Sequence, residues 1–171
     1  MTGFSQTLGS LVLLAAVAVE GDSEPRTLTL DASKRIAAAA VAEAKANHAA
    51  VVIAVVDAGG HLILLERMED GLPASVNVAI GKARTAALFG RRTGDFEEII
   101  ASGRRSMTTL LDFTPLQGGV PILRDGRVIG AVGASGVTAA TDEEIAKAGA
   151  ATVARSQRNN PSNINQPHQQ N

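Results

Sequence analysis

The sequence predicts an α+β fold in which helices cover an antiparallel sheet. Two pairs of short apolar runs are each joined by a tight glycine turn, at Gly59-Gly60 and at Asp125-Gly126, which is typical of β-hairpins. Longer segments whose apolar residues recur at helical spacing stand before, between and after these pairs. Strict alternation of strand and helix is missing, so the order disfavours a doubly wound parallel sheet.

The first helix and the first hairpin are predicted within residues 31–68. Asp31 is the predicted N-cap of an alanine-rich helix that ends at about Asn47. Residues 51–56 form a continuous apolar run, which is typical of a strand buried on both faces. This strand ends at Asp57, and the glycine turn leads into a second strand over residues 61–68.

Two helices are predicted between the hairpins. The first is opened by Pro73 and Ser75 and ends at about Arg91. Its apolar face holds Val76, Ile80, Ala83 and Ala87. The second spans about residues 93–109, and the pattern over residues 109–116 leaves room for a short extra strand.

Six of the 17 glycines fall in one stretch, Gly118 to Gly136, which reads GGVPILRDGRVIGAVGASG. Asp125-Gly126 between two apolar runs predicts a type I′ turn, because that turn needs positive φ at both central residues. The second run carries Gly130, Gly133 and Gly136. Their spacing matches neither common phosphate-binding glycine motif. We therefore interpret them as backbone that lies close to other atoms.

The last helix is followed by a change in composition. Thr141 and Glu144 form a predicted capping box that starts a helix to about Arg155. Residues 156–171 are rich in Asn and Gln, so we expect a disordered tail there. The predicted folded domain is residues 26–155.

Residues 1–25 form an extension ahead of that domain. They hold no Lys or Arg, and the apolar run over residues 11–19 resembles the core of a signal peptide, with Ala16-Val17-Ala18 as a cleavage site. Cleavage there predicts an exported protein, periplasmic or extracellular. The alternative is a cytoplasmic protein whose first residues are a frayed extension or a packed helix. The run is too short to span a bilayer, so no integral membrane segment is expected.

Composition narrows the classes of partner. The formal net charge of −1 gives no electrostatic reason to expect nucleic acid. Four phenylalanines with no tyrosine or tryptophan make a base-stacking platform improbable. The absence of cysteine excludes disulfides, thiolate metal sites and a cysteine nucleophile. The histidines match no zinc-site spacing, so no metal site is predicted.

The candidate binding residues are two cations, a histidine and a serine. His61, at the mouth of the first hairpin, has the chemistry to ligate iron or shuttle a proton. Arg67 ends an apolar strand beside a helix start, as a carboxylate-binding group would. Lys82 lies one position off the apolar face of its helix and would border a pocket there. For each, the alternative is a solvated side chain or a surface ion pair. Ser75 and Ser135 lack an accompanying His-Asp arrangement, which disfavours a serine hydrolase.

Asp57 has two interpretations. It follows a strand that is otherwise apolar, and an aspartate at that place bonds the backbone amides of the next turn. The alternative is a general base, for which the spacing identifies no partner. No catalytic residue is therefore assigned.

Three stretches of the chain resemble the GlcG/HbpS-like family, and most closely its GlcG branch. They are VVIAVVDAGGHLILLERMEDGLPASVNVAIGKARTAALFGRRT (51–93), GGVPILRDGRVIGAVGASG (118–136) and DEEIAKAGAA (142–151). The resemblance covers about residues 27–155. The family motifs fall on Asp57, Gly59, Gly60, Arg67, Met68, Lys82, Ala83, Gly119, Pro121, Gly130, Gly133, Ser135 and Gly136.

The resemblance implies a fold and a class of function. The fold is profilin-like, with a five-stranded antiparallel sheet between helices in α/β/α layers. Members bind haem, form homo-oligomers and accompany glycolate-utilisation genes. We therefore expect a small-molecule binding protein with haem or another tetrapyrrole as its ligand, and His61, Arg67, Lys82 and Ser135 as the cofactor-binding candidates.

Two other functions stay open. One is an enzyme or accessory protein that acts on a small carboxylate such as glycolate, with Arg67 or Lys82 holding the anion. The other is an oligomeric scaffold without small-molecule chemistry.

Overall fold

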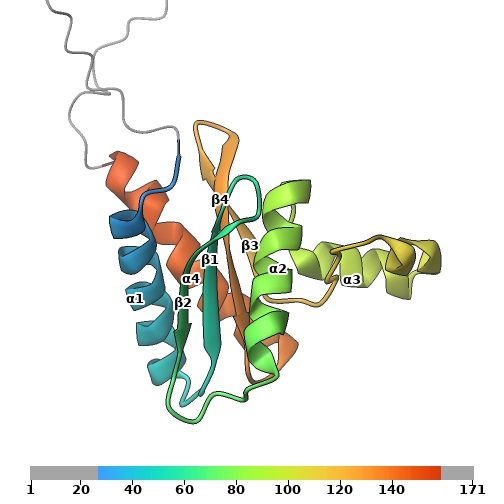
Figure 1. Ribbon diagram of the computed structural model, residues 1–171, viewed down its shortest axis with the longest axis horizontal. Coiled ribbons are helices and arrows are strands. Elements are labelled where there is room, and N and C mark those ends of the chain that lie inside the picture. Colours follow the sequence, from blue (N-terminus) through green and yellow to red (C-terminus); the bar gives the residue numbers. More distant parts are fainter. Residues whose placement is uncertain (1–26, 159–171) are drawn as a thin grey trace, which may run out of the picture.

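The computed structural model describes residues 27–158 (Figure 1). In chain order the elements are α1 (Leu30–Ala46), β1 (Val52–Asp57), β2 (Leu62–Arg67), α2 (Ser75–Phe89), α3 (Thr93–Ala101), the 3₁₀ helix η1 (Arg105–Thr109), β3 (Gly119–Arg124), β4 (Arg127–Ser135) and α4 (Ala139–Arg158). This is the predicted order, and both hairpins turn at the predicted glycines.

The strands form one antiparallel sheet in the order β2-β1-β4-β3. β1 pairs with β2 on one side and with β4 on the other, which joins the two hairpins into one sheet. The predicted α+β class is therefore confirmed. The five-strand count is wrong, because the described residues form four strands.

The segment between η1 and β3 shows why residues 109–116 form no strand. The Thr114 backbone N–H donates to Thr85 Oγ1 at 2.8 Å, and that of Gln117 donates to Glu97 Oε2 at 2.7 Å. Amides that bond the side chains of α2 and α3 are not available to a sheet ladder. Asp112 also has a φ of 52°, which interrupts an extended backbone.

The second of the two middle helices is shorter than predicted. α3 ends at Ala101, whereas the sequence predicted a helix to about Thr109. Gly103 has a φ of 118°, which no helical residue adopts. The chain resumes as the short helix η1 only after this break.

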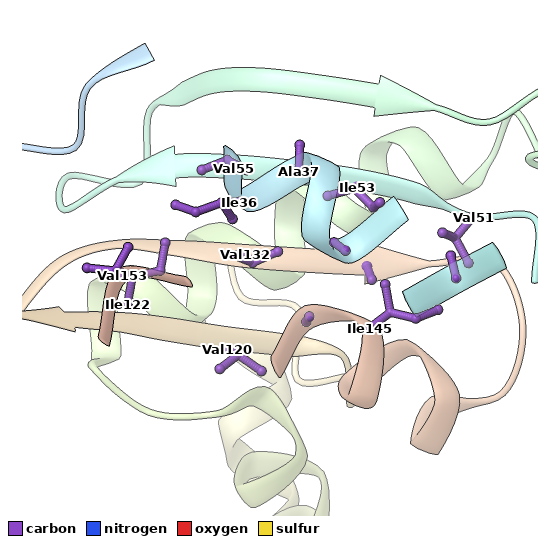
Figure 2. Packing of buried hydrophobic residues seen from close by; sticks show 14 of the residues in the cluster. Ile36, Ala37, Val51, Ile53, Val55, Val120, Ile122, Val132, Ile145 and Val153 are labelled. Atoms are coloured by element: carbon purple, nitrogen blue, oxygen red, sulfur yellow. The ribbon is translucent and has the colours of Figure 1, made fainter. Parts of the chain in front are cut away.

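Helices cover both faces of the sheet, as predicted (Figure 1). α1 and α4 cover one face and α2 the other. Val51, Ile53 and Val55 of the β1 segment belong to the core under α1 and α4 (Figure 2). Val52 and Val56 belong to the core under α2. Since β1 buries both faces, it needs the continuous apolar run that the sequence shows.

α2 approaches the sheet closely because both surfaces carry small residues. Its buried face includes Ala79, Ala83, Ala86 and Ala87. Under it lie Gly119 and Gly133, where an added Cβ would collide with the carbonyl oxygens of Lys82 and Ala79. This confirms that the glycines of the hairpin provide close backbone packing.

The turn between β3 and β4 has the predicted backbone. Asp125 and Gly126 have φ values of 50° and 73°. Positive φ at both central residues is the requirement of a type I′ turn.

Two helix starts differ from the prediction by a few residues. Thr29, not Asp31, is the N-cap of α1, and its hydroxyl accepts from the Ala32 N–H at 3.2 Å. α4 starts at Ala139, and the Thr141 N–H donates to the Thr138 hydroxyl at 3.2 Å. In both cases a threonine upstream of the predicted cap supplies the acceptor, so the helix starts earlier.

The predictions for the termini lie outside the described residues, apart from the end of α4, which continues to Arg158. They are the signal peptide in residues 1–25 and most of the tail in residues 156–171. Among the helices of residues 27–158, none combines the length and the apolar character needed to cross a bilayer.

Candidate functional site

The turn between β1 and β2 presents a histidine to solvent. Asp57 ends β1, Gly59 and Gly60 form the turn, and His61 precedes β2. Gly60 has a φ of 79°, which strains any residue with a side chain. The His61 side chain is 80% exposed. Its ring therefore lies at the surface at this end of the sheet.

Asp57 fixes the tautomer of His61. One carboxylate oxygen, Oδ1, accepts from the His61 backbone N–H at 2.9 Å, and Oδ2 lies 3.3 Å from the ring Nδ1. An ionised carboxylate only accepts hydrogen bonds, so the neutral ring carries its proton on Nδ1 and keeps a lone pair on Nε2. The structural interpretation of Asp57 is thus confirmed, and Nε2 remains as a ligand atom on an exposed ring.

Asp57 is ionised, as its hydrogen bond with the His61 ring requires. Burial raises the pKa of Asp57, but the hydrogen bond from the His61 backbone, the positive charge of the His61 ring when that ring is protonated, and the hydrogen bond from the ring outweigh it. The net pKa lies below the ordinary value of 3.8. A carboxylate that holds one ring nitrogen of a histidine is the usual second shell of a histidine that binds metal through the other.

α2 supplies the surroundings of this turn. A Cβ built at Gly60 lies 2.9 Å from Arg84 Cγ and 3.4 Å from Leu88 Cγ, so both side chains pack on the turn. Arg84 Nε donates to the Gly60 carbonyl at 3.3 Å, and its Nη1 lies 3.7 Å from Asp112. Leu62 and Leu88 are both about half exposed. The histidine therefore has an exposed apolar surface and one arginine beside it.

A hollow of about 430 Å³ adjoins Arg84, between α2 and the segment 110–114. Ile80, Leu111 and Phe113 are among its apolar lining residues. Its volume falls in the range of small-molecule sites. Phe113 is fixed by edge-on contacts with Phe89 and Phe96, at ring-centroid distances of 5.3 and 5.2 Å.

The other end of the sheet brings Arg67 and Ser135 into one row. Val52 pairs with Arg67 on β2 and with Ser135 on β4. Directly paired residues in an antiparallel sheet project from the same face, and Val52 belongs to the core under α2. Arg67 and Ser135 therefore lie on the face that α2 covers, at the end opposite His61.

Lys82 lies inside the molecule in an ion pair. Its Nζ donates to Asp142 Oδ2 at 2.8 Å and to the Ala134 carbonyl at 3.0 Å. Both charged side chains are 4% exposed. Lys82 thus ties α2 to β4 and to the start of α4, and two of its three ammonium N–H donors are used in these bonds.

The acidic start of α4 forms a second buried cluster. Glu143 Oε1 lies 2.9 Å from Arg92 Nη1 and 2.7 Å from Lys147 Nζ. Burial raises the pKa of Glu143, but hydrogen bonds from Lys147 and Gln117 and the charges of Lys147 and Arg92 outweigh it, so the net pKa is below 4.5. These contacts join α3, α4 and the start of β3.

The candidates predicted from the sequence thus separate into three places. His61 lies at one end of the sheet, Arg67 and Ser135 at the other, and Lys82 in the interior. Within residues 27–158, no group of three or more His, Asp or Glu side chains has the geometry to hold a metal ion.

Arg84 and Leu88 are site residues that the sequence did not indicate. Arg84 and Leu88 are one helical turn apart, so their spacing indicated a shared face. Nothing local indicated that this face meets Gly60, because that contact depends on how α2 crosses the sheet. The partner of Lys82 could not be identified from the sequence either, since Asp142 lies 60 residues further along the chain.

Comparison with known proteins identifies the family. A family model described as haem degrading protein HbpS-like matches residues 28–151. Protein GlcG of Escherichia coli (strain K12) is 46% identical over 108 residues, which cover 63% of this chain and 81% of GlcG.

Two solved structures are also similar. The crystal structure of HbpS has a TM-score of 0.71 and 30% identity, and covers 77% of this chain and 93% of HbpS. The crystal structure of a PduOC:haem complex has a TM-score of 0.66 and 29% identity, and covers 73% of this chain and 94% of PduOC. The resemblance found in the sequence is confirmed, and the chain belongs to the HbpS-like family.

Proposed function

We propose that the protein binds haem through His61. The observation that carries this proposal is the pair of Asp57 with an exposed histidine, in which the carboxylate holds Nδ1 and leaves Nε2 free. A histidine prepared in this way is the common axial ligand of haem iron. When bound, haem supplies an iron centre that can exchange electrons or bind a small ligand.

The surroundings of His61 fit a tetrapyrrole. A porphyrin has apolar faces and carboxylate substituents, so it needs exposed apolar side chains and a cation. Leu62 and Leu88 provide the apolar contacts beside the turn. The Arg84 guanidinium, 37% of whose side chain is exposed, is the cation closest to the turn that the described contacts identify, and it can pair with a propionate.

Related proteins support the same function. The family description names haem degradation, and the similar PduOC structure is a complex with haem. Neither assigns a ligand residue in this chain. The assignment of His61 rests on its exposure and on its contact with Asp57.

The proposal is tested by titrating ferric haem into the purified chain and following the Soret absorption. We expect a saturable change for the unaltered protein. His61→Ala is expected to weaken binding by about tenfold or more and to shift the Soret band, since the axial ligand is lost. Asp57→Asn is expected to weaken binding less, because the ring stays but its tautomer is no longer fixed.

His48→Asn is the matched control. His48 is exposed and lies outside this site, and asparagine tolerates its φ of 52°. We expect this variant to titrate like the unaltered protein. Absence of any Soret change in the unaltered protein, or equal binding by His61→Ala, would overturn the proposal.

A further inference from the structure

We propose that the end of the sheet under the first turn of α2 is a second binding site, for a small carboxylate with a single negative charge. The site combines the hydroxyls of Ser75 and Ser135 with the guanidinium of Arg67. It does not depend on haem binding, because Asp57 and Val52 lie at opposite ends of β1.

The two serines point to a ligand because they are buried without partners. Ser75 is 6% exposed and Ser135 is 7% exposed. Within residues 27–158 neither hydroxyl makes a hydrogen bond, whereas the buried Ser33 donates to the Thr29 carbonyl at 2.9 Å. Neither serine oxygen is among the buried side-chain atoms without a partner in residues 27–158, so both hydroxyls remain within reach of solvent and of a small ligand. A carboxylate oxygen can accept a hydrogen bond from each.

The strand register places Ser135 under the start of α2. A Cβ at Gly133 would collide with the Ala79 carbonyl of α2. Ser135 is two residues further along β4, so it projects from the same face about 6.6 Å away. One turn of α2 before Ala79 is Ser75, at a rise of about 5.4 Å. The two serines therefore lie at the same end of the contact between α2 and β4.

No acidic side chain at the start of α2 would repel an anion. The N-cap of α2, Ala74, makes no side-chain capping bond, and the first turn holds no acidic residue. The Ser75 and Val76 N–H groups donate to the carbonyls of Leu72 and Pro73. These two N–H groups are therefore not available to a ligand. The positive end of the α2 dipole still favours a negative charge beside it.

Arg67 supplies the matching cation. It occupies the same row as Ser135, two strands away, which is about 10 Å between backbones. The Arg67 side chain is exposed and has no ion pair among the described residues. A Cβ at Gly71 would lie 3.0 Å from Arg67 Cγ, so the stem runs along the loop that leads into α2.

The charged side chains of the loop between β2 and α2 limit the charge that a bound ligand can carry. Glu69 and Asp70 lie in the same loop and are exposed. One arginine against two acidic residues leaves no net positive charge for a doubly charged phosphate. Two hydroxyls and one guanidinium satisfy the two oxygens of a carboxylate, which identifies a small monocarboxylate as the ligand class.

The proposal is tested by thermal unfolding of the full chain with acetate, lactate or inorganic phosphate, each against sodium chloride of equal ionic strength. A ligand that binds only the folded state raises the melting temperature. We expect acetate or lactate to raise it and phosphate to do so less. No rise with either carboxylate, or a larger rise with phosphate, overturns the proposal.

Two variants separate binding from folding. Ser135→Ala is expected to melt without ligand at or above the temperature of the unaltered protein, because its hydroxyl has no partner, and to lose most of the carboxylate-induced rise. Arg67→Gln is expected to lose about tenfold in carboxylate affinity, as measured by calorimetry. The control is Arg35→Gln on α1, which is exposed on the other face of the molecule and keeps the full rise. Full rises in both site variants would refute the assignment.

Discussion

At the scale of single residues, charged side chains in this protein serve two different purposes. Lys82, Asp142 and Glu143 are buried and join elements that are far apart in the sequence. His61 and Arg67 are exposed and lie at opposite ends of the sheet. The first group joins the elements of the fold, and the second is the one to which we assign ligand binding, so we expect substitutions in the two groups to have separable effects.

Breaking the buried ion pair of Lys82 is expected to destabilise the fold strongly. Lys82→Met leaves the Asp142 carboxylate buried without its cation, which typically costs about 3–5 kcal/mol in the free energy of unfolding. Urea denaturation at one protein concentration measures this. The double variant Lys82→Met/Asp142→Leu is expected to lose less than the single variant, since no charge is left unpaired. A loss of under about 1 kcal/mol in Lys82→Met would contradict this role.

Glu143 makes stability depend on pH in the acidic range. Its pKa in the folded protein lies below the ordinary 4.5 because Lys147, Gln117 and Arg92 outweigh burial. A lowered folded pKa stabilises the protein above the unfolded pKa, and this contribution is lost as the pH falls from about 4.5 through the folded value. Glu143→Gln is expected to flatten this part of the profile of unfolding free energy against pH. An unchanged slope between pH 5 and pH 3 would show that Glu143 is not responsible.

At the scale of elements, the sequence predicted those helices, strands and turns that depend on the pattern of neighbouring residues. The two hairpins, the apolar face of α2 and the type I′ turn follow from spacing and from glycine chemistry over a few residues. The starts of α1 and α4 were misplaced by a few residues, since a threonine hydroxyl upstream of each predicted cap accepts from the helix.

Pairings between distant segments were not predictable from one sequence. The expected fifth strand does not form within residues 27–158, where the amides of residues 114 and 117 bond side chains on α2 and α3, which no local pattern reveals. The partners of Lys82 and the row that joins Arg67 to Ser135 depend on sheet register for the same reason. The sequence indicated His61 and Arg67 as candidate binding residues, but not that they lie at opposite ends of the sheet.

The contact between α2 and β4 sets the distance of the helix from the sheet. Gly133→Ala would put a methyl group against the Ala79 carbonyl. Overpacking of this kind costs about 1–3 kcal/mol, which we expect to see as a lower urea midpoint. The control is Gly126→Asn in the exposed turn, where nothing lies within 4 Å and asparagine tolerates a φ of 73°. Equal stability of the two variants would contradict the close packing of α2.

At the scale of the whole molecule, several exposed apolar side chains gather near the hollow beside α2. Leu111 is 93% exposed, and Leu110, Leu88 and Phe89 are each about half exposed. Exposed apolar side chains that gather on one part of the surface are typical of a contact with a second chain. The family resemblance also implies homo-oligomers.

We therefore expect the protein to self-associate, and Leu111→Lys to shift it toward smaller species. Light scattering coupled to gel filtration measures the mass. The substitution should not lower the stability of the single chain, since the Leu111 side chain is almost fully exposed. A monomeric mass for the unaltered protein at micromolar concentration would contradict the expectation.

The two ends of one sheet are thus proposed to bind different ligands. This is tested most directly by two-dimensional NMR of backbone amides in the perdeuterated protein, with gallium protoporphyrin as a diamagnetic stand-in for haem and with acetate. We expect the porphyrin to shift amides around His61, Leu62 and Leu88, and acetate to shift those around Ser75 and Ser135. Porphyrin-induced shifts that are absent from the His61 turn, or that centre on the row of Arg67 and Ser135, would contradict this expectation.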